Sequence, residues 1–358
     1  MEKVISGLFL FLSFSCISQS IHSDSIQYFL PSNFTGQIAV KKFNGEFIYK
    51  KNFGNKDRLK VEPINDSTLF NIGQLSHSFV DFAIQHLLKL SKIKLSENIT
   101  SYLPQFPYEN ITVEHLINHQ SGLPASYLKF YHKEYYNDWN IKLEDRQKRM
   151  DNDDLLLLIH TKKPTLSFEP GKKTQYADFN YLILVSLLER VTQKDFEFLI
   201  KELVSQSHIP CQPKACSKQD TILNKGWGYR FFPDSTLALC DNLRSRGFPF
   251  DDGTKGNQHI YLSASDLAHW GQFLIQELHL DSVKPTKTRS FPDPYQFTYD
   301  NELNILRSKG GYGGIHSHII YTYNHQWIVT IHSALLNPDM NSNALNELLR
   351  YLNRIQIP

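Results

Sequence analysis

The chain of 358 residues is predicted to adopt an α/β (α+β) fold, in which helices flank an antiparallel sheet built from N- and C-terminal strands. Two observations support this prediction. Strand-forming residues dominate 36–54 and 315–336, and apolar helical patterns fill much of the sequence between them. The sequence shows no internal repeat, so the part between the strands is expected to be a mostly helical insertion.

Residues 1–20 are predicted to be a secretory signal peptide. A charged start, Met1-Glu2-Lys3, precedes an apolar run from Val4 to Phe14, and small polar residues follow as far as Ser20. The apolar run is too short to cross a bilayer, and no later run is long enough to do so. We therefore expect an exported protein that is periplasmic, secreted or associated with the cell envelope.

The cysteines leave two questions open. Cys16 could carry an N-terminal lipid anchor after a lipobox, although Ser13 stands where such sites usually have leucine. The other three cysteines are an odd number and cannot all pair within one chain. Cys211 and Cys216 could close a small ring in the loop IPCQPKACSKQD, and free or partly buried thiols are the alternative.

Residues 21–358 are expected to form one domain with two parts. The sheet subdomain is predicted to comprise about 24–95 and 265–358, and the helical subdomain about 96–264. This division follows from the order of the patterns, since strand character returns only near the end of the chain.

The first elements are a hairpin and a central helix. In GQIAVKKFNGEFIYKKNFG two strand-forming runs flank Asn44-Gly45, a favoured turn pair. A helix from about Leu75 to Leu90 follows, and it is apolar on more than one face, as expected of a buried helix. A second helix is predicted to end at Ser121-Gly122-Leu123-Pro124, and DNDDLLLLIH should form another, capped by its Asp and Asn residues.

The middle of the chain combines apolar helices with polar surface stretches. An apolar helix is predicted from Phe179 and another after Lys194. The stretch from about Ser126 to Leu166 is polar, aromatic and charged, and Ser205 to Gly256 is rich in turn formers, which predicts an elaborated surface region.

The last elements return to strand character. SASDLAHWGQFLIQ is predicted to be a helix with Ser263 or Ser265 as its N-cap. Strands over 315–336 are expected to break at Asn324-His325, and a final amphipathic helix should run from about Asn343 to Leu352.

Composition excludes several classes of function. A hydrophobic fraction of 41% with 13% aromatic residues supports a sizeable core, and a net charge of +2 without a basic run argues against nucleic acid as a partner. His316 and His318 alternate along a predicted strand and should face the same side. No acidic or histidine partner is identifiable for them, so neither a metal nor a cofactor is expected.

Several segments together resemble the serine β-lactamase and DD-peptidase (penicillin-binding-protein-like) superfamily, within its class C β-lactamase and esterase-like branch. They occur in that superfamily's order, and the resemblance extends from about Gly36 to the C-terminus. The segments are FNIG, LSENITSYLPQFPYENITVEHLINHQSGLP, FEPGKKTQYADFNYLILVSLLERV, IYLSASDLAHWGQFL and KGGYGGIHSHIIYTY. The resemblance implies a β-lactamase/transpeptidase-like fold with a cleft lined by three motifs.

The first motif of the superfamily, Ser-x-x-Lys, is replaced here by Gln74-Leu75-Ser76-His77. The resemblance places the nucleophile at Gln74 and the base at His77. A glutamine amide has no nucleophilic oxygen, and a histidine base achieves nothing without a nucleophile beside it. Ser76 is not expected to substitute, because a two-residue step rotates a helical side chain by roughly 200°, and Ser78 is displaced along the helix axis and turned aside.

The second and third motifs are also altered. Tyr-x-Asn appears as Tyr176-Ala177-Asp178, which keeps the phenol, but the Asp178 carboxylate cannot donate to a substrate carbonyl. Lys-Thr-Gly or His-x-Gly appears as Lys309-Gly310-Gly311, without the middle hydroxyl. Lys309 could hold a ligand carboxylate, and the two glycines leave room for a ligand along the strand.

Three functional hypotheses follow from these substitutions. The favoured one is an exported, non-catalytic pseudoenzyme whose cleft binds a peptide or cell-wall fragment. The alternative is an active amidase or esterase of the β-lactamase, DD-peptidase or esterase type, in which His77 and Tyr176 handle the protons of a bound water. The third is a purely structural role based on surface contacts. We favour loss of acyl transfer, because this chemistry needs the nucleophile above all.

Overall fold

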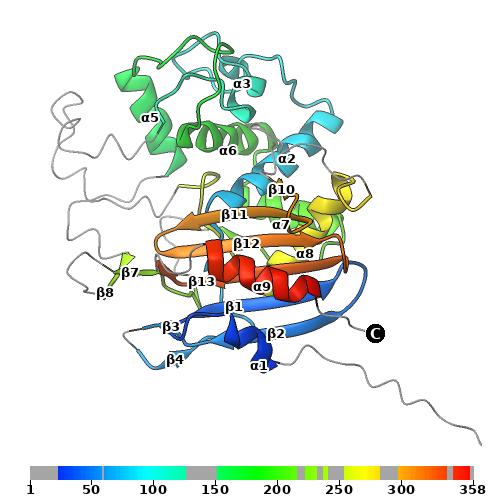
Figure 1. Ribbon diagram of the computed structural model, residues 1–358. Coiled ribbons are helices and arrows are strands. Elements are labelled where there is room, and N and C mark those ends of the chain that lie inside the picture. Colours follow the sequence, from blue (N-terminus) through cyan, green and yellow to red (C-terminus); the bar gives the residue numbers. More distant parts are fainter. Residues whose placement is uncertain are drawn as a thin grey trace, which may run out of the picture.

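A computed structural model describes residues 23–58, 60–125, 151–215, 222–231, 237–240, 254–282, 297–336 and 342–354. Within these residues the main element is a six-stranded antiparallel sheet in the order β10-β11-β12-β13-β1-β2 (Figure 1). Its strands are β1 (Gly36–Lys42), β2 (Phe47–Phe53), β10 (Thr298–Asp300), β11 (Ile305–Tyr312), β12 (Ile315–Thr322) and β13 (Trp327–Ser333).

The two ends of the chain meet in the middle of this sheet. β1 pairs antiparallel with β13, with Ile38 opposite Ile331, so the N-terminal hairpin continues the C-terminal meander. The predicted hairpin β1–β2 is present, and its register shifts between Val40 and Lys41. The predicted α+β class, with an antiparallel sheet from both ends of the chain, is therefore confirmed.

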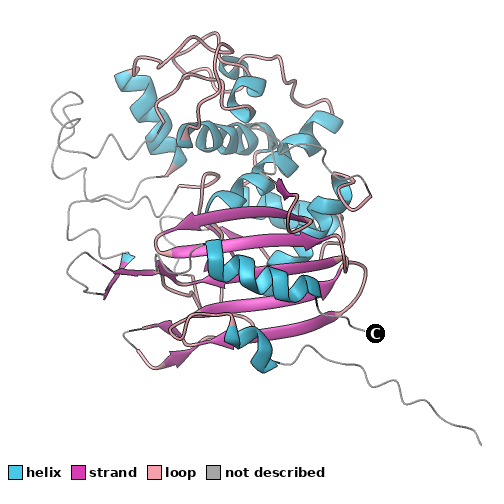
Figure 2. Ribbon diagram, in the orientation of Figure 1, coloured by secondary structure: helices cyan, strands magenta, loops and turns pink. Residues whose placement is uncertain are grey.

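Helices cover both faces of the sheet (Figure 2). α1 (Ser23–Tyr28) and α9 (Ser342–Arg354) lie on one face, where Leu349 shares a core with Ile320 and Val329. α8 (Ala264–Glu277) packs on the other face against β13 and β1, and its N-cap is Ser263, whose side chain accepts the Asp266 N–H. The sequence had left Ser263 and Ser265 as alternatives for this cap.

The central helix begins with a tighter turn than predicted. A 3₁₀ turn, η1 (Gly73–Ser76), leads into α2 (His77–Lys89), and the two together cover the predicted helix. Phe79, Val80, Ala83 and Ile84 are fully buried in the largest core cluster, which also contains residues of α6 and α8. The helix therefore lies between the sheet and the helical part of the molecule.

The helical part contains α3 (Val113–Ile117), α5 (Asn152–Lys162), α6 (Asp178–Thr192) and α7 (Phe196–Gln206). Figure 1 shows α3, α5 and α6 together above the sheet. The prediction that the helix before Pro124 ends at Ser121 was wrong. α3 ends at Ile117 with Asn118 as its C-cap, because His119 adopts a left-handed conformation with φ of 51°.

Short strands and one turn complete the described structure. They are β3 (Asn55–Asp57), β4 (Glu62–Pro63), β5 (Phe70–Asn71), η2 (Ile99–Ser101), β6 (Lys214–Ala215), β7 (Tyr229–Phe231), β8 (Leu237–Leu239), β9 (Ile260–Leu262) and β14 (Leu335–Leu336). β9 pairs with β5, which fixes the segment just before η1. Three of these strands lie in the predicted surface region 205–256, whose described parts are thus not purely loops.

Two predictions about the chain's ends and cysteines depend on residues outside the described ranges. The signal peptide and Cys16 lie there, as does Cys216. Cys211 is a free, buried thiol, which favours the alternative of unpaired cysteines over the small ring. Across the described ranges, no helix has the length and apolar character that crossing a membrane requires.

The packing around Trp270 gives a test of the core. Its side chain is fully buried, its ring stacks on Phe79 at 3.9 Å, and its Nε1–H donates to Ser78 Oγ at 2.8 Å. Trp270→Ala should lower the free energy of unfolding by about 3–5 kcal/mol, because it leaves a large cavity and removes the hydrogen bond that the Ser78 hydroxyl accepts. Urea unfolding measures this loss. Leu223→Ala is the control, because this residue is 82% exposed and its replacement should change the free energy of unfolding little. A Trp270→Ala loss no larger than the control's would contradict this packing.

Candidate functional site

The site is built where the turn η1 meets strand β11. Asn71 Oδ1 accepts the Gly73 N–H at 2.8 Å and so shapes the backbone that enters the turn. Gly73 has φ of 58°, and a Cβ there would lie 2.3 Å from Gly311 N. On the facing strand, a Cβ on Gly310 would lie 2.1 Å from Ile72 O. Only glycines allow the two backbones to come this close.

This contact determines what the side chain of Gln74 does. Its Oε1 accepts the backbone N–H of Gly311 at 2.9 Å, so the amide bridges η1 and β11. The Gly311 N–H points away from β12, toward the other edge of β11. On that edge β10 pairs only with residues 305–307 among the described strands. The glutamine therefore occupies the backbone donor that lies nearest to the predicted nucleophile position.

His77 lies one 3₁₀ turn after Gln74 and is almost completely buried. Residues three apart nearly eclipse in such a turn, so the predicted common side of positions 74 and 77 is retained. The His77 ring stacks on Tyr181 at 3.7 Å with an interplanar angle of 7°, and its Nε2 lies 3.0 Å from Asn257 Oδ1. Burial lowers the pKa of His77 to about 4, against the opposing effect of the Asn257 hydrogen bond.

Tyr176 lies beside His77, with ring centroids 6.0 Å apart. Its hydroxyl donates to Asn257 Oδ1 at 2.7 Å. Burial first, and then the neighbouring Asp178 carboxylate, raise the pKa of Tyr176 well above its usual range, against a smaller opposing effect of Gln74. The phenol therefore stays protonated at neutral pH and acts as a donor.

Asn257 is the acceptor that Tyr176 and His77 share. Its amide oxygen accepts a hydrogen bond from the Tyr176 hydroxyl. The same oxygen lies against His77 Nε2, and because an amide oxygen can only accept, Nε2 carries the proton of the ring. Its Nδ2 is buried and has no hydrogen-bond partner within the described residues. Both proton-handling candidates therefore donate to one amide oxygen.

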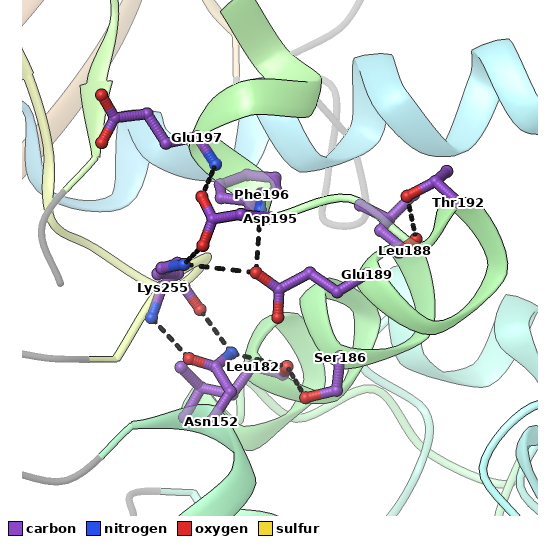
Figure 3. A network of polar contacts seen from close by, with 10 residues as sticks. All are labelled: Asn152, Leu182, Ser186, Leu188, Glu189, Thr192, Asp195, Phe196, Glu197 and Lys255. Carbon is purple, nitrogen blue, oxygen red and sulfur yellow. Dashed lines mark hydrogen bonds and ion pairs between the residues drawn. The ribbon is translucent and has the colours of Figure 1, made fainter.

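Contacts of Lys255 with the helical part of the molecule hold the loop that carries Asn257 (Figure 3). Asn152 exchanges two hydrogen bonds with the backbone of Lys255, at 2.7 and 2.9 Å. The Lys255 ammonium, whose side chain is only 12% exposed, pairs with Asp195 and, at 3.2 Å, with Glu189. These contacts come from α5, α6 and the start of α7, so the helical part of the molecule fixes Asn257.

His119 closes the buried side of the site. Its left-handed backbone directs the ring toward Tyr176, with centroids 4.8 Å apart. Its Nδ1 accepts the Ala177 N–H at 3.2 Å and lies 3.0 Å from Asn180 Nδ2. Burial and the neighbouring His77 lower the pKa of His119 to about 3. The two imidazoles are therefore both neutral at pH 7.

Neither serine next to Gln74 faces the contact with β11. Ser76 is fully buried, and its Oγ accepts the Ile260 N–H at 3.3 Å. Ser78 donates to Leu75 O at 2.6 Å and accepts from the Trp270 indole. Both hydroxyls therefore bond to the backbone or the core, as the helical geometry predicted.

The remaining predicted residues divide into two groups. Asp178 is buried as the first residue of α6, and its N–H donates to Ala125 O at 3.0 Å. Lys309 is exposed, and strand alternation puts its side chain on the face of β11 opposite to that of Gly310. The buried residue that shares the face of Gly310 is Ser308. The structure thus assembles Gln74, His77, Tyr176, Asp178 and Gly311, while the Lys309 side chain leaves from the other face.

The predicted alternation of His316 and His318 is present in β12, where both are half-buried. Across the described residues, no group of three or more His, Cys, Asp or Glu side chains is placed to hold a metal ion.

Sequence reasoning missed Asn257 and His119. His119 stands in the segment that carried the resemblance, but nothing in a single sequence signals its left-handed backbone or its burial. Asn257 follows a turn-rich stretch whose composition predicts a surface region. It reaches the site through contacts that span about a hundred residues of chain, such as Asn152 to Lys255.

Burial of a neutral His77 predicts a specific dependence of stability on pH. Its pKa is about 4 in the folded protein and 6.5 in the unfolded one, so the unfolded state binds more protons between these values. The contribution is complete above pH 6.5 and is lost as the pH falls toward 4. Between about pH 7 and about pH 4.5, the wild type should lose about 2 kcal/mol more unfolding free energy than His77→Gln.

Urea unfolding at both pH values measures this difference. Other buried histidines lower stability in acid in the same direction, so the comparison is between variants. His160→Gln, at an exposed histidine, should keep the wild-type dependence on pH. Equal losses in the wild type and His77→Gln would show that His77 is not held neutral.

Comparisons with known proteins identify the family and the fold. The family described as Beta-lactamase matches residues 43–353. Penicillin-binding protein 4* of Bacillus subtilis is 24% identical over 249 residues, 68% of this chain but 53% of that protein, so the chain spans about half of its length. Teichoic acid D-alanine hydrolase of Staphylococcus aureus is 25% identical over 319 residues, 85% of this chain and 71% of that protein.

Among solved structures, a penicillin-binding protein from Bacillus halodurans superimposes with a TM-score of 0.70 at 18% identity, over 93% of this chain and 99% of that one. This likeness confirms the β-lactamase/transpeptidase-like fold. The family match covers most of the chain and confirms the resemblance drawn from its motifs. The chain belongs to the beta-lactamase family.

Proposed function

We propose that this protein is an exported, non-catalytic member of the beta-lactamase family whose cleft binds a peptide or peptidoglycan fragment without forming an acyl-enzyme. The observation that carries the proposal is the hydrogen bond from Gly311 N–H to Gln74 Oε1. It puts an amide side chain at the position of the nucleophile and, at the same time, occupies the neighbouring backbone donor.

Acyl transfer requires a nucleophile, a base and donors aimed at the acyl oxygen. Position 74 supplies an amide, and the hydroxyls of Ser76 and Ser78 bond elsewhere. The backbone donor at Gly311 has the character of an oxyanion-hole group, since it faces the side chain at position 74. Gln74 satisfies that donor with its own carbonyl, much as a bound acyl group would.

The positions predicted to move protons are poor bases. The Nε2–H of His77 donates to Asn257, which leaves only Nδ1 as an acceptor, and burial lowers the pKa of the ring to about 4. The phenol of Tyr176 donates to the same oxygen, and its pKa is raised by burial and by Asp178. These observations favour the pseudoenzyme over a hydrolase in which His77 and Tyr176 activate a water.

One edge of β11 nevertheless suits an extended ligand. β10 pairs only with residues 305–307 of β11, so the backbone groups beyond Arg307 could accept an added chain along that edge. Asp178 lies beside Tyr176 near this edge. Names among the relatives, such as penicillin-binding protein 4*, make a peptide or cell-wall fragment the ligand to test first.

The decisive experiment is a test for covalent adducts. The purified mature chain is incubated with a penicillin and analysed by intact mass, beside a penicillin-binding protein that has its Ser-x-x-Lys motif. We expect no added mass, because loss of a nucleophilic serine alone slows such chemistry by roughly a million-fold. Gln74→Ala should also remain unmodified, since it frees the Gly311 donor without supplying a nucleophile.

A penicillin adduct on the wild type would overturn the proposal. If that adduct disappeared in His77→Ala or Tyr176→Phe, the reorganised hydrolase would be the correct description.

Ligand binding in the cleft is tested by thermal stabilisation with a muropeptide. We expect a shift in Tm that is unchanged in Lys309→Ala, whose side chain points to the opposite face of β11, and larger in Gln74→Ala than in the wild type. A ligand carbonyl could then accept the Gly311 N–H without displacing the glutamine, a gain of about fivefold in affinity for one hydrogen bond. Lys94→Ala, at an exposed lysine distant in sequence from the three motifs, serves as the control. Stabilisation that Gln74→Ala does not change would place the muropeptide elsewhere, and no stabilisation with a protein partner recovered instead would favour the structural role.

A further inference from the structure

A cluster of four basic side chains lies on one face of the β11–β12 hairpin. Arg307 and Lys309 alternate along β11, and His316 and His318 alternate along β12. His318 pairs directly with Lys309, and His316 pairs with Gly311, where a Cβ would meet the His316 ring at 3.0 Å. All four side chains therefore point to one face, which is opposite to the face that meets η1.

The positive charge of this cluster has no acidic counterpart in the part of the chain that the structure describes. None of the four side chains forms a hydrogen bond or an ion pair there. The nearby acids of the β10–β11 connection are engaged, since Asp300 accepts the Leu303 N–H and Glu302 pairs with Arg350 at 2.8 Å. Like charges held together without compensation destabilise the empty protein and attract an anion.

Electrostatic effects on His318 support this picture. After burial, the groups that lower the pKa of His318 to about 3 are His316, Arg307, Lys309 and His332, with no carboxylate among them. For His316 the neighbouring charge with the same effect is again Lys309.

The ring of His318 is also oriented as a donor. Its Nδ1 is buried and has no partner within the described residues. A proton on Nδ1 would bury an unpaired N–H, so the proton belongs on Nε2. This leaves Nε2–H as the group available to a ligand, beside the Lys309 ammonium on the paired strand.

α9 adds to the positive potential at this end of the sheet. It crosses the same face, since Leu349 shares a core with Ile305 and Ile320 (Figure 1). The pairing of Arg350 with Glu302 places its C-terminal end at the start of β11. Its N-terminal end, which carries the positive pole of the helix dipole, therefore points toward the hairpin turn.

We propose that this face of the hairpin binds phosphate groups of an anionic ligand. A doubly charged group with several acceptor oxygens fits uncompensated guanidinium, ammonium and imidazole donors better than one carboxylate does. Same-face residues lie about 7 Å apart along a strand and about 5 Å apart across the pair, so the cluster is long enough for more than one phosphate. The proposal does not depend on the loss of acyl transfer.

Inorganic phosphate and tripolyphosphate are the probes, titrated into the full chain at low ionic strength and followed by calorimetry and by the ring signals of His316 and His318. Both should bind, with acetate at least tenfold weaker. Arg307→Gln/His318→Gln should weaken phosphate binding about tenfold or more. The matched control Arg190→Gln/His160→Gln removes an arginine and a histidine from exposed positions elsewhere and should bind like the wild type.

Tighter binding of tripolyphosphate than of phosphate would identify a polymer of phosphates, and equal binding a single phosphate group. Both outcomes support the proposal. Equal weakening in the two double variants, acetate binding as tightly as phosphate, or ring signals unmoved in the wild type would overturn it. Muropeptide stabilisation that persists in Arg307→Gln/His318→Gln separates this site from the cleft, and the melting temperature without ligand verifies that the variant is folded.

Discussion

The close approach of the turn Gly73–Ser76 to strand β11 is the constraint on which the site depends. The backbones of the turn and the strand can come this close because Gly73 and Gly310 have no Cβ; a Cβ at either position would clash with the facing backbone. Whatever side chain occupies position 74 is therefore held against the Gly311 N–H. In this chain the side chain is long enough to reach that donor and bond to it. The same scaffold that would align a nucleophile thus holds an amide in a fixed, satisfied position.

Behind that contact, the site is organised around neutral groups. Burial keeps His77 and His119 uncharged, and their rings stack with Tyr181 and Tyr176. Asn257 accepts from both His77 and Tyr176, so both groups are held as hydrogen-bond donors. A buried polar network of this kind rigidifies a structure when its members are paired, whereas catalysis needs groups that can change their protonation state. Such a pocket is better suited to holding a shape than to moving protons.

The sequence predicted the fold and the central part of the site because both depend on local patterns. The alternation in β12 and β13, the apolar helix after Gly73 and the order of the family's segments are all visible in one sequence. Asn257 could not be predicted, because Lys255 and Asn152 place it through contacts distant along the chain. The end of α3 was wrong because a non-glycine residue adopts a left-handed backbone at His119. The face on which Lys309 lies required the exact register of β11 against β12.

The ion pairs of Lys255 have a consequence for engineering the site. These pairs with Glu189 and Asp195 hold the loop that brings Asn257 to the buried rings, and they belong to helices remote from the turn at Gln74. A serine introduced at position 74 would face an imidazole that burial holds neutral, and a lysine introduced at position 77 would have its ammonium buried against an amide fixed by a distant ion pair. Building the Ser-x-x-Lys motif into this chain therefore requires changes in separate parts of the molecule and not only at these two positions.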